Sequence, residues 1–186
     1  MVKSDKLIAA GEWDGGFAWE LHASDTFPPR RLCTAIACVA IDNLEENTIA
    51  LTHNQRGWEL LGGHFDADSE TFQEAIRRES LEEGGFVGGP IVPFAYRKIT
   101  ASGPPATTGR AAAYPHPVSY MSYVYALRSG EYQPVTGEEI IESGVYTPAE
   151  IARLVERGHT KPMELTIIRL GLAAARADHN LPPLAD

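Results

Sequence analysis

The segment from residue 62 to residue 86 constrains this chain more than any other, because it places three carboxylates on one face of an expected helix. The three are Glu79, Glu82 and Glu83, which fall within about 100° of one another around a helix axis. Phe72 and Ile76 lie on the same arc, at spacings typical of a helix face that packs against a core. The pattern therefore predicts acidic side chains at the end of a buried face.

Carboxylates that are crowded in this way repel one another. On an exposed helix each pair of like charges costs about 0.2–0.5 kcal/mol, and partial burial raises the cost further. A bound divalent cation removes the repulsion, and carboxylates, as hard oxygen ligands, favour Mg²⁺ or Mn²⁺ over Zn²⁺. The alternative is a solvated acidic helix face, which is the common environment of a Glu-Glu pair.

The residues from Gly62 onward read GGHFDADSETFQEAIRRESLEEGGF. This stretch resembles the Nudix box, G-x5-E-x7-R-E-U-x-E-E-x-G-U, in which U is a bulky aliphatic residue. The positions that match are Gly63, Glu70, Arg78, Glu79, Glu82, Glu83, Gly85 and Phe86. Two features depart from the box: the stretch between Gly63 and Glu70 is one residue longer, and Ser80 stands where the box has an aliphatic residue.

The resemblance implies a fold and an activity. Nudix proteins form an α/β/α sandwich around a mixed sheet, and most of them hydrolyse a pyrophosphate linked to another moiety, commonly a nucleoside diphosphate derivative, with Mg²⁺ or Mn²⁺. It also implies that the three box glutamates are metal ligands, that the Gly63 carbonyl is a further ligand, and that an ion pair between Arg78 and Glu70 orients the cluster. Carboxylate-bound metals suit this reaction because they neutralise phosphate charge and generate hydroxide.

The general base is left open between a box residue and a later one. In some Nudix proteins the base is a box glutamate, here Glu79, and in others it comes from a later loop, where this chain has Glu138 and Glu139. Within that later pair we choose Glu139, and the alternative is that both are surface charges. A base must come within about 3 Å of the attacking water, so the choice depends on geometry.

Candidate substrate contacts are cationic or aromatic. Arg56, Lys98 and Arg110 are candidates for phosphate binding, because guanidinium groups in particular suit phosphate oxygens. A solvated position is the alternative for each of them. Trp58 either stacks on a base or packs in the core, and His116 either contacts substrate or is a turn residue between prolines.

Apolar segments between turn residues predict strands at Phe17–His22, Leu32–Ile41, Thr48–Leu51, Pro90–Thr100 and Ser119–Leu127. Residues 58–60 are expected to form a further strand that leads into the box. Residues 32–41 are apolar on both faces, which predicts a strand covered on both sides and hence an α/β/α arrangement.

The box helix is expected from Glu70 to Glu83, with Ser69 as its N-cap and Glu74 paired with Arg78. Two further helices are expected, one beginning at Thr147-Pro148 and one over Met163–Ala177. Residues 101–117 have no period and are rich in Gly and Pro. We expect them to form a long flap beside the metal site that selects the substrate.

Composition restricts the class of protein. The 186 residues, 44% of them hydrophobic, suffice for one core, so we expect a single domain over residues 1–186. A net charge of −9 argues against nucleic-acid and membrane partners, which require basic surfaces. Without an apolar leader or spanning segment, we expect a cytoplasmic enzyme that acts on a phosphorylated small molecule, either as a monomer or as a homodimer.

Two other functions stay open. A Nudix-like sensor would bind a nucleotide without cleaving it, although such domains usually lack intact box glutamates. An isopentenyl diphosphate isomerase, which shares the fold, needs a cysteine beside a histidine. Cys33 and Cys38 lack the His-Pro-Cys or Cys-Gly-His neighbourhood of that enzyme and are expected to be small buried hydrophobes.

Overall fold

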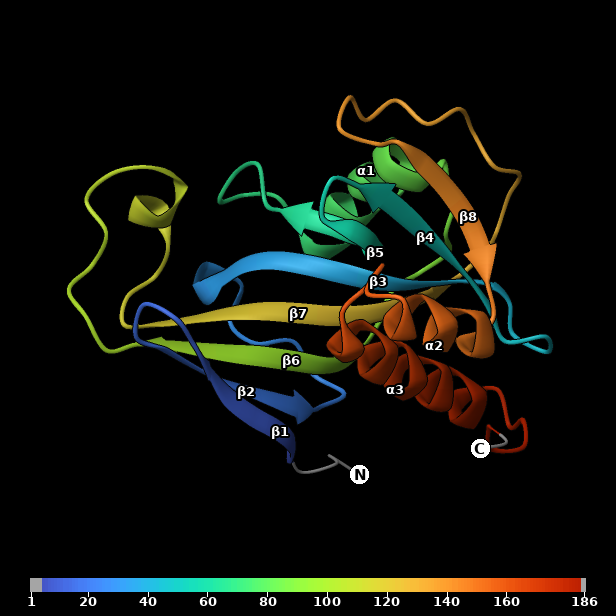
Figure 1. Ribbon diagram of the computed structural model, residues 1–186, viewed down its shortest axis with the longest axis horizontal. Coiled ribbons are helices and arrows are strands. Elements are labelled where there is room, and N and C mark those ends of the chain that lie inside the picture. The colour runs from blue at the N-terminus through green and yellow to red at the C-terminus, as the bar shows by residue number, and fades with distance from the viewer. Residues whose placement is uncertain (1–4, 185–186) are drawn as a thin grey trace.

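The computed structural model describes residues 5–184 and contains an eight-stranded sheet with helices on both faces (Figure 1). The strands are β1 (Lys6–Trp13), β2 (Phe17–Ala23), β3 (Cys33–Asn43), β4 (Thr48–Asn54), β5 (Gly57–His64), β6 (Val92–Ala101), β7 (Val118–Leu127) and β8 (Glu142–Tyr146). The helices are α1 (Phe72–Gly84), α2 (Pro148–Glu156) and α3 (Pro162–Asp178), with 3-10 helices at Arg30–Leu32 and Arg110–Ala113.

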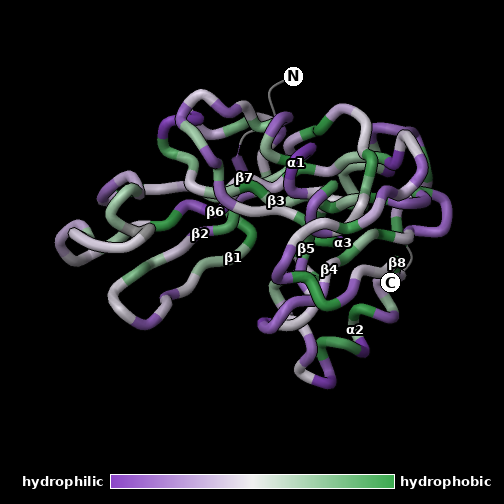
Figure 2. Tube along the Cα trace, turned by 90° about the horizontal axis from the view of Figure 1, so that it is seen from above, coloured by the Kyte–Doolittle hydropathy of each residue, from purple (hydrophilic) through white to green (hydrophobic). Residues whose placement is uncertain are grey.

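The sheet is mixed, as predicted. Its strand order is β1-β2-β6-β7-β3-β5-β4-β8. β3 and β7 pair in parallel at the centre, whereas pairs such as β6 with β7 and β4 with β5 are antiparallel. Seen from above, β1, β2 and β6 extend to one side of the helices (Figure 2).

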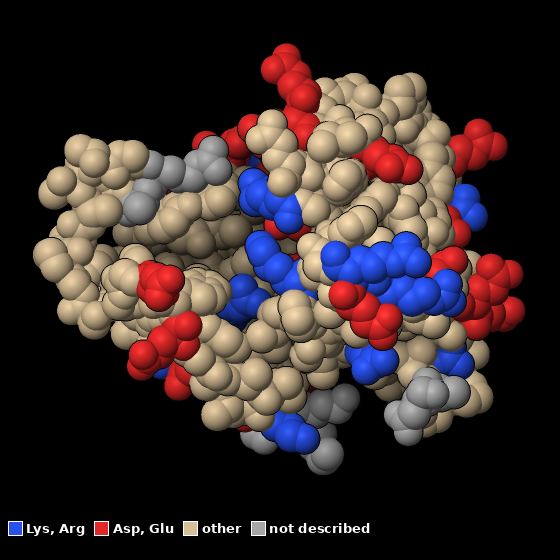
Figure 3. All heavy atoms as spheres, viewed as in Figure 1, with Lys and Arg blue, Asp and Glu red and all other residues tan. Residues whose placement is uncertain are grey.

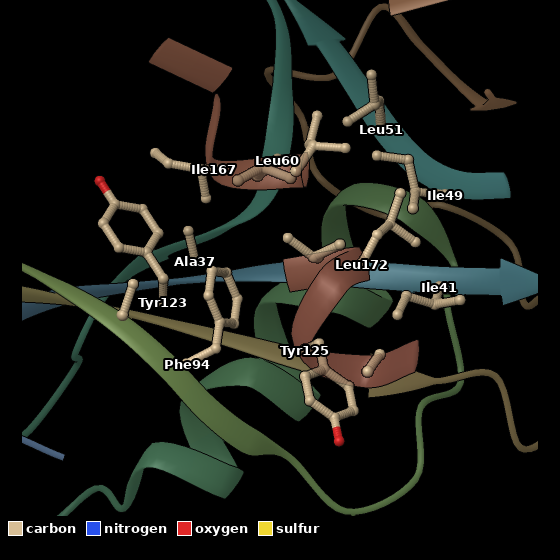
Figure 4. Packing of buried hydrophobic residues seen from close by; sticks show 14 of the residues in the cluster. Ala37, Ile41, Ile49, Leu51, Leu60, Phe94, Tyr123, Tyr125, Ile167 and Leu172 are labelled. Atoms are coloured by element: carbon tan, nitrogen blue, oxygen red, sulfur yellow. The ribbon is translucent and has the colours of Figure 1, made fainter. Parts of the chain in front are cut away.

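Side chains of β3 alternate between two cores, which explains why this strand is apolar on both faces. On the side of α1, it contributes Ile36, Cys38 and Ala40 to a buried cluster. On the side of α2 and α3, it contributes Ala37, Val39 and Ile41 to a second, larger cluster, part of which is drawn in Figure 4. The predicted α/β/α layering is thus confirmed.

The start of α1 differs from the prediction. Thr71, and not Ser69, is the N-cap, because its side chain accepts a hydrogen bond from the N–H of Glu74. Glu74 in turn accepts from the N–H of Thr71 at 2.8 Å, so it completes a capping box instead of pairing with Arg78. The helix ends at Gly84, one residue beyond the predicted Glu83, and its C-cap is Gly85, whose φ of 60° is in the left-handed region that favours glycine.

Strand predictions were correct in place but incomplete. The two edge strands, β1 and β8, were missed, and the strand into the box is longer than residues 58–60, since β5 runs from Gly57 to His64. β1 lies at the sheet edge, and its side chains are mostly exposed or half-buried, so its sequence lacks a clear apolar alternation. Among the helices of residues 5–184, none is both long and apolar enough to cross a membrane.

The capping box makes a testable difference between two neighbouring hydroxyl residues. Thr71→Ala should lower the free energy of unfolding by about 1 kcal/mol, because α1 loses its N-cap hydrogen bond. Ser69→Ala, the matched control, should change it by less than about 0.5 kcal/mol. Urea denaturation of both variants measures the difference, and an equal or reversed effect would contradict the assignment of the cap.

Candidate active site

A cavity of about 550 Å³ collects charged side chains from several elements. The acidic ones that line it are Glu59, Asp66, Glu79, Glu83, Glu139 and Glu164. The basic ones are Arg56, Arg97 and Lys161. Charged groups that converge on a concave site from separate elements are typical of a binding or catalytic site.

α1 directs two carboxylates into this cavity. Glu83 Oε2 accepts a hydrogen bond of 2.8 Å from the backbone N–H of Gly62, and Glu79 Oε1 lies 2.8 Å from Nη1 of Arg78. Burial raises the pKa of both carboxyl groups. For Glu83 the negative charge of Glu79 adds to the effect of burial, and the pKa reaches about 7. Two half-buried carboxylates held this close favour a compensating cation.

Arg78 is the centre of an ion-pair network beside the cavity, two of whose lining residues, Asp66 and Glu79, it contacts. Its Nε lies 3.0 Å from Glu70 Oε1 and 3.1 Å from Asp66 Oδ2, and its Nη2 donates to the His64 carbonyl at 3.0 Å. Burial alone would raise the pKa of Glu70, but hydrogen bonds from Arg78 and from the N–H of Asp66 outweigh burial and lower it. The expected ion pair between Arg78 and Glu70 is therefore present, and Arg78 also ties Glu79 to it.

Glu82 lies apart from the two other box glutamates. Its side chain is 47% exposed, is not part of the cavity wall, and places Oε2 3.7 Å from Nη1 of Arg78. Within residues 5–184, no three Asp, Glu, His or Cys side chains are arranged to hold a metal ion. The three-glutamate cluster expected from the helix face is thus not preformed, and Nη1 of Arg78 lies between its members, 2.8 Å from Glu79 and 3.7 Å from Glu82.

The groups that remain in the cavity nevertheless suit a divalent cation. A Cβ built on Gly63 would lie 2.3 Å from Oε1 of Glu79, so glycine at this position lets the carboxylate approach the backbone of β5. Carboxylate and backbone carbonyl oxygens form a hard, all-oxygen donor set of the kind that Mg²⁺ and Mn²⁺ prefer. The residues present therefore fit the expected cation.

Two of the predicted residues outside the box also face this cavity. Arg56 lines it and forms an ion pair with Glu59, with Nη2 2.8 Å from Oε2. Glu139 lines it from the loop that precedes β8. Both positions are compatible with the roles expected from the sequence, phosphate binding for Arg56 and the general base for Glu139.

The other predicted contacts lie elsewhere. Trp58 is 6% exposed and packs in the larger core, stacked on His53 with ring centroids 5.0 Å apart, so it takes the core role and not the base-stacking one. His116 lies in a neighbouring groove, where its Nε2 is 2.8 Å from the Gly103 carbonyl oxygen. Arg110 begins a 3-10 helix, and its side chain lies outside what the structure describes.

Sequence reasoning missed two of the cavity's cations, Lys161 and Arg97, and Arg97 is the one without an ion pair. It lines the cavity from β6, and its buried Nε has no hydrogen-bond partner within the described chain. The neighbouring residue, Lys98, was the candidate instead, but it points to the other face of the sheet, where it pairs with Glu20 at 3.2 Å. Adjacent residues of a strand point to opposite faces of the sheet, so only one of Arg97 and Lys98 can face the cavity. The sequence does not show which face of β6 that is.

Tyr114 joins the expected flap to the box. Its hydroxyl group contacts Nε2 of His64, and the two rings stack with centroids 5.6 Å apart. Tyr114 and His64 both line the cavity. Residues 101–117 therefore do reach the site, as the flap hypothesis requires.

The raised pKa of Glu83 predicts a pH-dependent stability of the metal-free protein. Between the ordinary value of 4.5 and about 7, the folded protein holds a proton that the unfolded chain has lost, so this group's contribution to stability disappears as the pH rises through 7. The glutamine side chain in Glu83→Gln is neutral at every pH, and its carbonyl oxygen can still accept the hydrogen bond from the Gly62 N–H. The variant's free energy of unfolding relative to wild type should therefore rise by about 1–3 kcal/mol from pH 5 to pH 8 in chelator.

Urea titrations of both proteins at the two pH values measure this difference. Glu46→Gln, in an exposed turn, serves as the control and should show no comparable trend. A stability difference between Glu83→Gln and wild type that does not change with pH would show that Glu83 is ionised at little cost.

Comparisons with known proteins agree with the fold and the motif. The chain matches the family model of the NUDIX domain over residues 31–166. Among solved structures it is similar to the pyrophosphohydrolase BsRppH of Bacillus subtilis (18% identity over 69% of this chain and 72% of that chain, TM-score 0.50). It is also similar to a NUDIX hydrolase from Nitrosomonas europaea (19% identity over 82% and 93%, TM-score 0.50). No curated protein matches. Because the family model covers most of the chain, this protein belongs to the Nudix family.

Proposed function

We propose that this Nudix-type pyrophosphohydrolase uses Mg²⁺ or Mn²⁺ to cleave the pyrophosphate bond of a nucleoside diphosphate linked to another moiety. Nucleotide sugars, ADP-ribose-like compounds, dinucleotides and nucleoside triphosphates belong to this class. The observation that carries the proposal is the position of Glu79 and Glu83, half-buried against β5 in a cavity that three basic residues also line. The Bacillus subtilis structure that resembles this fold is described as a pyrophosphohydrolase, which supports the same reaction type.

Some residues of the site would bind the cation, and others orient the residues that bind it. Glu79, Glu83 and the carbonyl of Gly63 would hold the cation, and Glu82 is the further ligand that the box provides next to them. Once bound, the cation neutralises phosphate charge and lowers the pKa of a bound water. Arg78 is a positioning residue, since its contacts with Glu70 and Glu79 fix the carboxylate on which the site depends.

Three cations are available to the substrate phosphates. Arg56 and Lys161 both pair with Glu59, at 2.8 Å and 3.4 Å, so part of their charge is already balanced. Arg97 has no carboxylate partner of this kind within the described chain, and its guanidinium lies over aromatic rings. Arg97 is half-buried, and its charge acts on the nearby Glu164 carboxyl group, but the two form no ion pair. Its guanidinium group is therefore available to form paired hydrogen bonds with phosphate oxygens. We therefore place Arg97 first among the phosphate contacts.

For the general base we retain Glu139. It lines the cavity from a loop that is joined to the end of α1, where the N–H of Gly137 donates to the Glu82 carbonyl at 2.8 Å. This places a carboxylate near the box from a separate segment, as a base that approaches an attacking water requires. Glu79 is the alternative, but its carboxylate forms an ion pair with Arg78, which makes it a weaker proton acceptor. The two assignments differ in the expected effect of Glu139→Gln, which should lower kcat far more than KM if Glu139 is the base.

The observations disfavour the isomerase alternative. Cys33 and Cys38 are free and buried, and neither lines the carboxylate cavity. Burial raises the pKa of the Cys38 thiol to about 12, which leaves it protonated and unreactive. A nucleotide sensor remains the second candidate, and turnover distinguishes it from an enzyme.

The decisive experiment is hydrolysis of a substrate panel with Mg²⁺, with Mn²⁺ and with chelator. The panel contains a nucleotide sugar, ADP-ribose, a dinucleotide and a deoxynucleoside triphosphate, and phosphate or nucleoside monophosphate release is measured. Glu83→Gln and Glu82→Gln should each lose more than about 100-fold in kcat/KM, because the cation loses a ligand. Glu46→Gln is the charge-matched control. Full activity in both box variants, or binding of the panel without turnover by wild type, would refute the proposal.

The two glycines at the end of β5 give a second, independent prediction. A Cβ at Gly62 would lie 2.3 Å from the backbone oxygen of Ile36, and its φ of 151° disfavours other residues, so Gly62→Ala should lower the free energy of unfolding by about 2 kcal/mol or more. A Cβ at Gly63 meets only the flexible end of Glu79. Gly63→Ala should therefore fold with near wild-type stability but lose at least about 10-fold in kcat/KM, since the carboxylate is displaced.

Thermal melts and rate measurements on the same preparations test this contrast. An active Gly63→Ala enzyme with wild-type kcat/KM would show that the approach of Glu79 to β5 is not needed for the reaction.

A further inference from the structure

An apolar groove of about 330 Å³ lies directly beside the carboxylate cavity. The two share Thr34, Ile99 and Tyr114 in their walls, so they are immediate neighbours. Figure 3 shows a hollow next to the projecting loop, with Lys and Arg atoms at its inner edge. The groove is therefore placed to receive whatever part of a substrate extends beyond the charged cavity.

The walls of the groove are fixed to one another. Ser102 donates from both its backbone N–H and its hydroxyl group to the Gly16 carbonyl, at 2.9 Å each, which joins the 102–117 loop to the turn between β1 and β2. The N–H of Ala101 donates to the Pro117 carbonyl at 2.9 Å, which closes the base of the loop. Together with the contact between Tyr114 and His64, these bonds define a built recess and not a chance gap between segments.

Two large aromatic side chains line the groove and are partly open to solvent. Trp13 is 43% exposed and Phe17 is 40% exposed, and they are cross-strand partners at the end of the β1–β2 hairpin. Exposing aromatic area to water is unfavourable, and a stacked ring of a ligand would remove the cost. Both residues lie outside residues 31–166, the part of the chain that matches the NUDIX domain.

Arg97 connects the groove with the charged cavity. Its Cζ lies 5.5 Å from the ring centroid of Trp13, a groove residue, while its side chain lines the carboxylate cavity. A phosphate held by Arg97 would therefore have an aromatic wall next to it. This juxtaposition of a phosphate-binding cation and open rings matches a group that carries a phosphate on one side and a planar ring on the other.

We propose that this groove binds the nucleobase of the substrate, with the ring packed against Phe17 and Trp13 and the adjoining phosphate on Arg97. The inference rests on the proposed function, because it assigns the nucleoside end of that substrate. Thr34 and Ser119 are polar residues among the otherwise largely apolar lining of the groove, and the Thr34 hydroxyl, which donates to the Tyr120 carbonyl at 3.2 Å, can still accept a hydrogen bond from the polar edge of a base.

Equilibrium binding tests the assignment without requiring turnover. Calorimetric titration should give AMP at least a 10-fold lower Kd than ribose 5-phosphate, since the two differ by the base. Phe17→Ala and Trp13→Leu should each reduce this ratio to less than about 3-fold. Phe17→Tyr, which keeps the ring, and Leu7→Ala, which removes an exposed apolar side chain from β1 outside the groove, should keep the full ratio.

Three results would overturn the inference: equal affinity for AMP and ribose 5-phosphate, an undiminished ratio in both groove variants, or tighter binding of geranyl phosphate than of AMP. The last would assign the groove to an apolar chain. Thermal melts of each variant confirm that the protein is folded. Base-dependent binding in a wild-type protein that cleaves none of the panel would contradict the proposed function and leave the groove assignment intact.

Discussion

The close approach of α1 to the end of β5 is the constraint on which the site depends. Gly63 allows this approach, because a side chain there would meet the Glu79 carboxylate, while Gly62 lets β5 lie close to the backbone of β3. The approach has an electrostatic cost, visible in the raised pKa of Glu83. Arg78 offsets part of that cost by pairing with Glu70 and Glu79. The protein thus keeps partly buried negative charge at a position where packing alone would favour an apolar side chain.

Features with a local cause could be predicted from the sequence. The box helix, its end at Gly85 and the two-sided burial of β3 all follow from the spacing of apolar residues and glycines along one stretch of chain. The ion pair between Arg78 and Glu70 followed from the family resemblance. The N-cap was wrong because Ser69 and Thr71 are both acceptable caps. The choice was made by Glu74, which lies at the right spacing to complete a capping box with Thr71.

Features that depend on strand pairing could not be predicted in this way. Arg97 and Glu139 come to the carboxylates from segments that are distant in sequence, and their neighbours Lys98 and Glu138 carry the same charges. Lys98 was chosen in place of Arg97, and the choice of Glu139 over Glu138 had no geometric basis in the sequence. Which member of each pair faces the cavity is decided by the register of β6 and by the path of the loop before β8. Trp58 was ambiguous for a related reason, since an aromatic residue next to a glycine-rich strand end suits a core as well as a ligand.

The carboxylate cavity and the apolar groove share three lining residues and are otherwise built from different parts of the chain. The carboxylates that would hold the cation come from a single helix, whereas the groove is assembled from the β1–β2 hairpin and the loop before β7. Substitutions in the hairpin can therefore accumulate without altering the charged residues. A lineage of such proteins could diverge in what it recognises while its reaction chemistry stays fixed, and new specificities would be sought first among changes near the N-terminus.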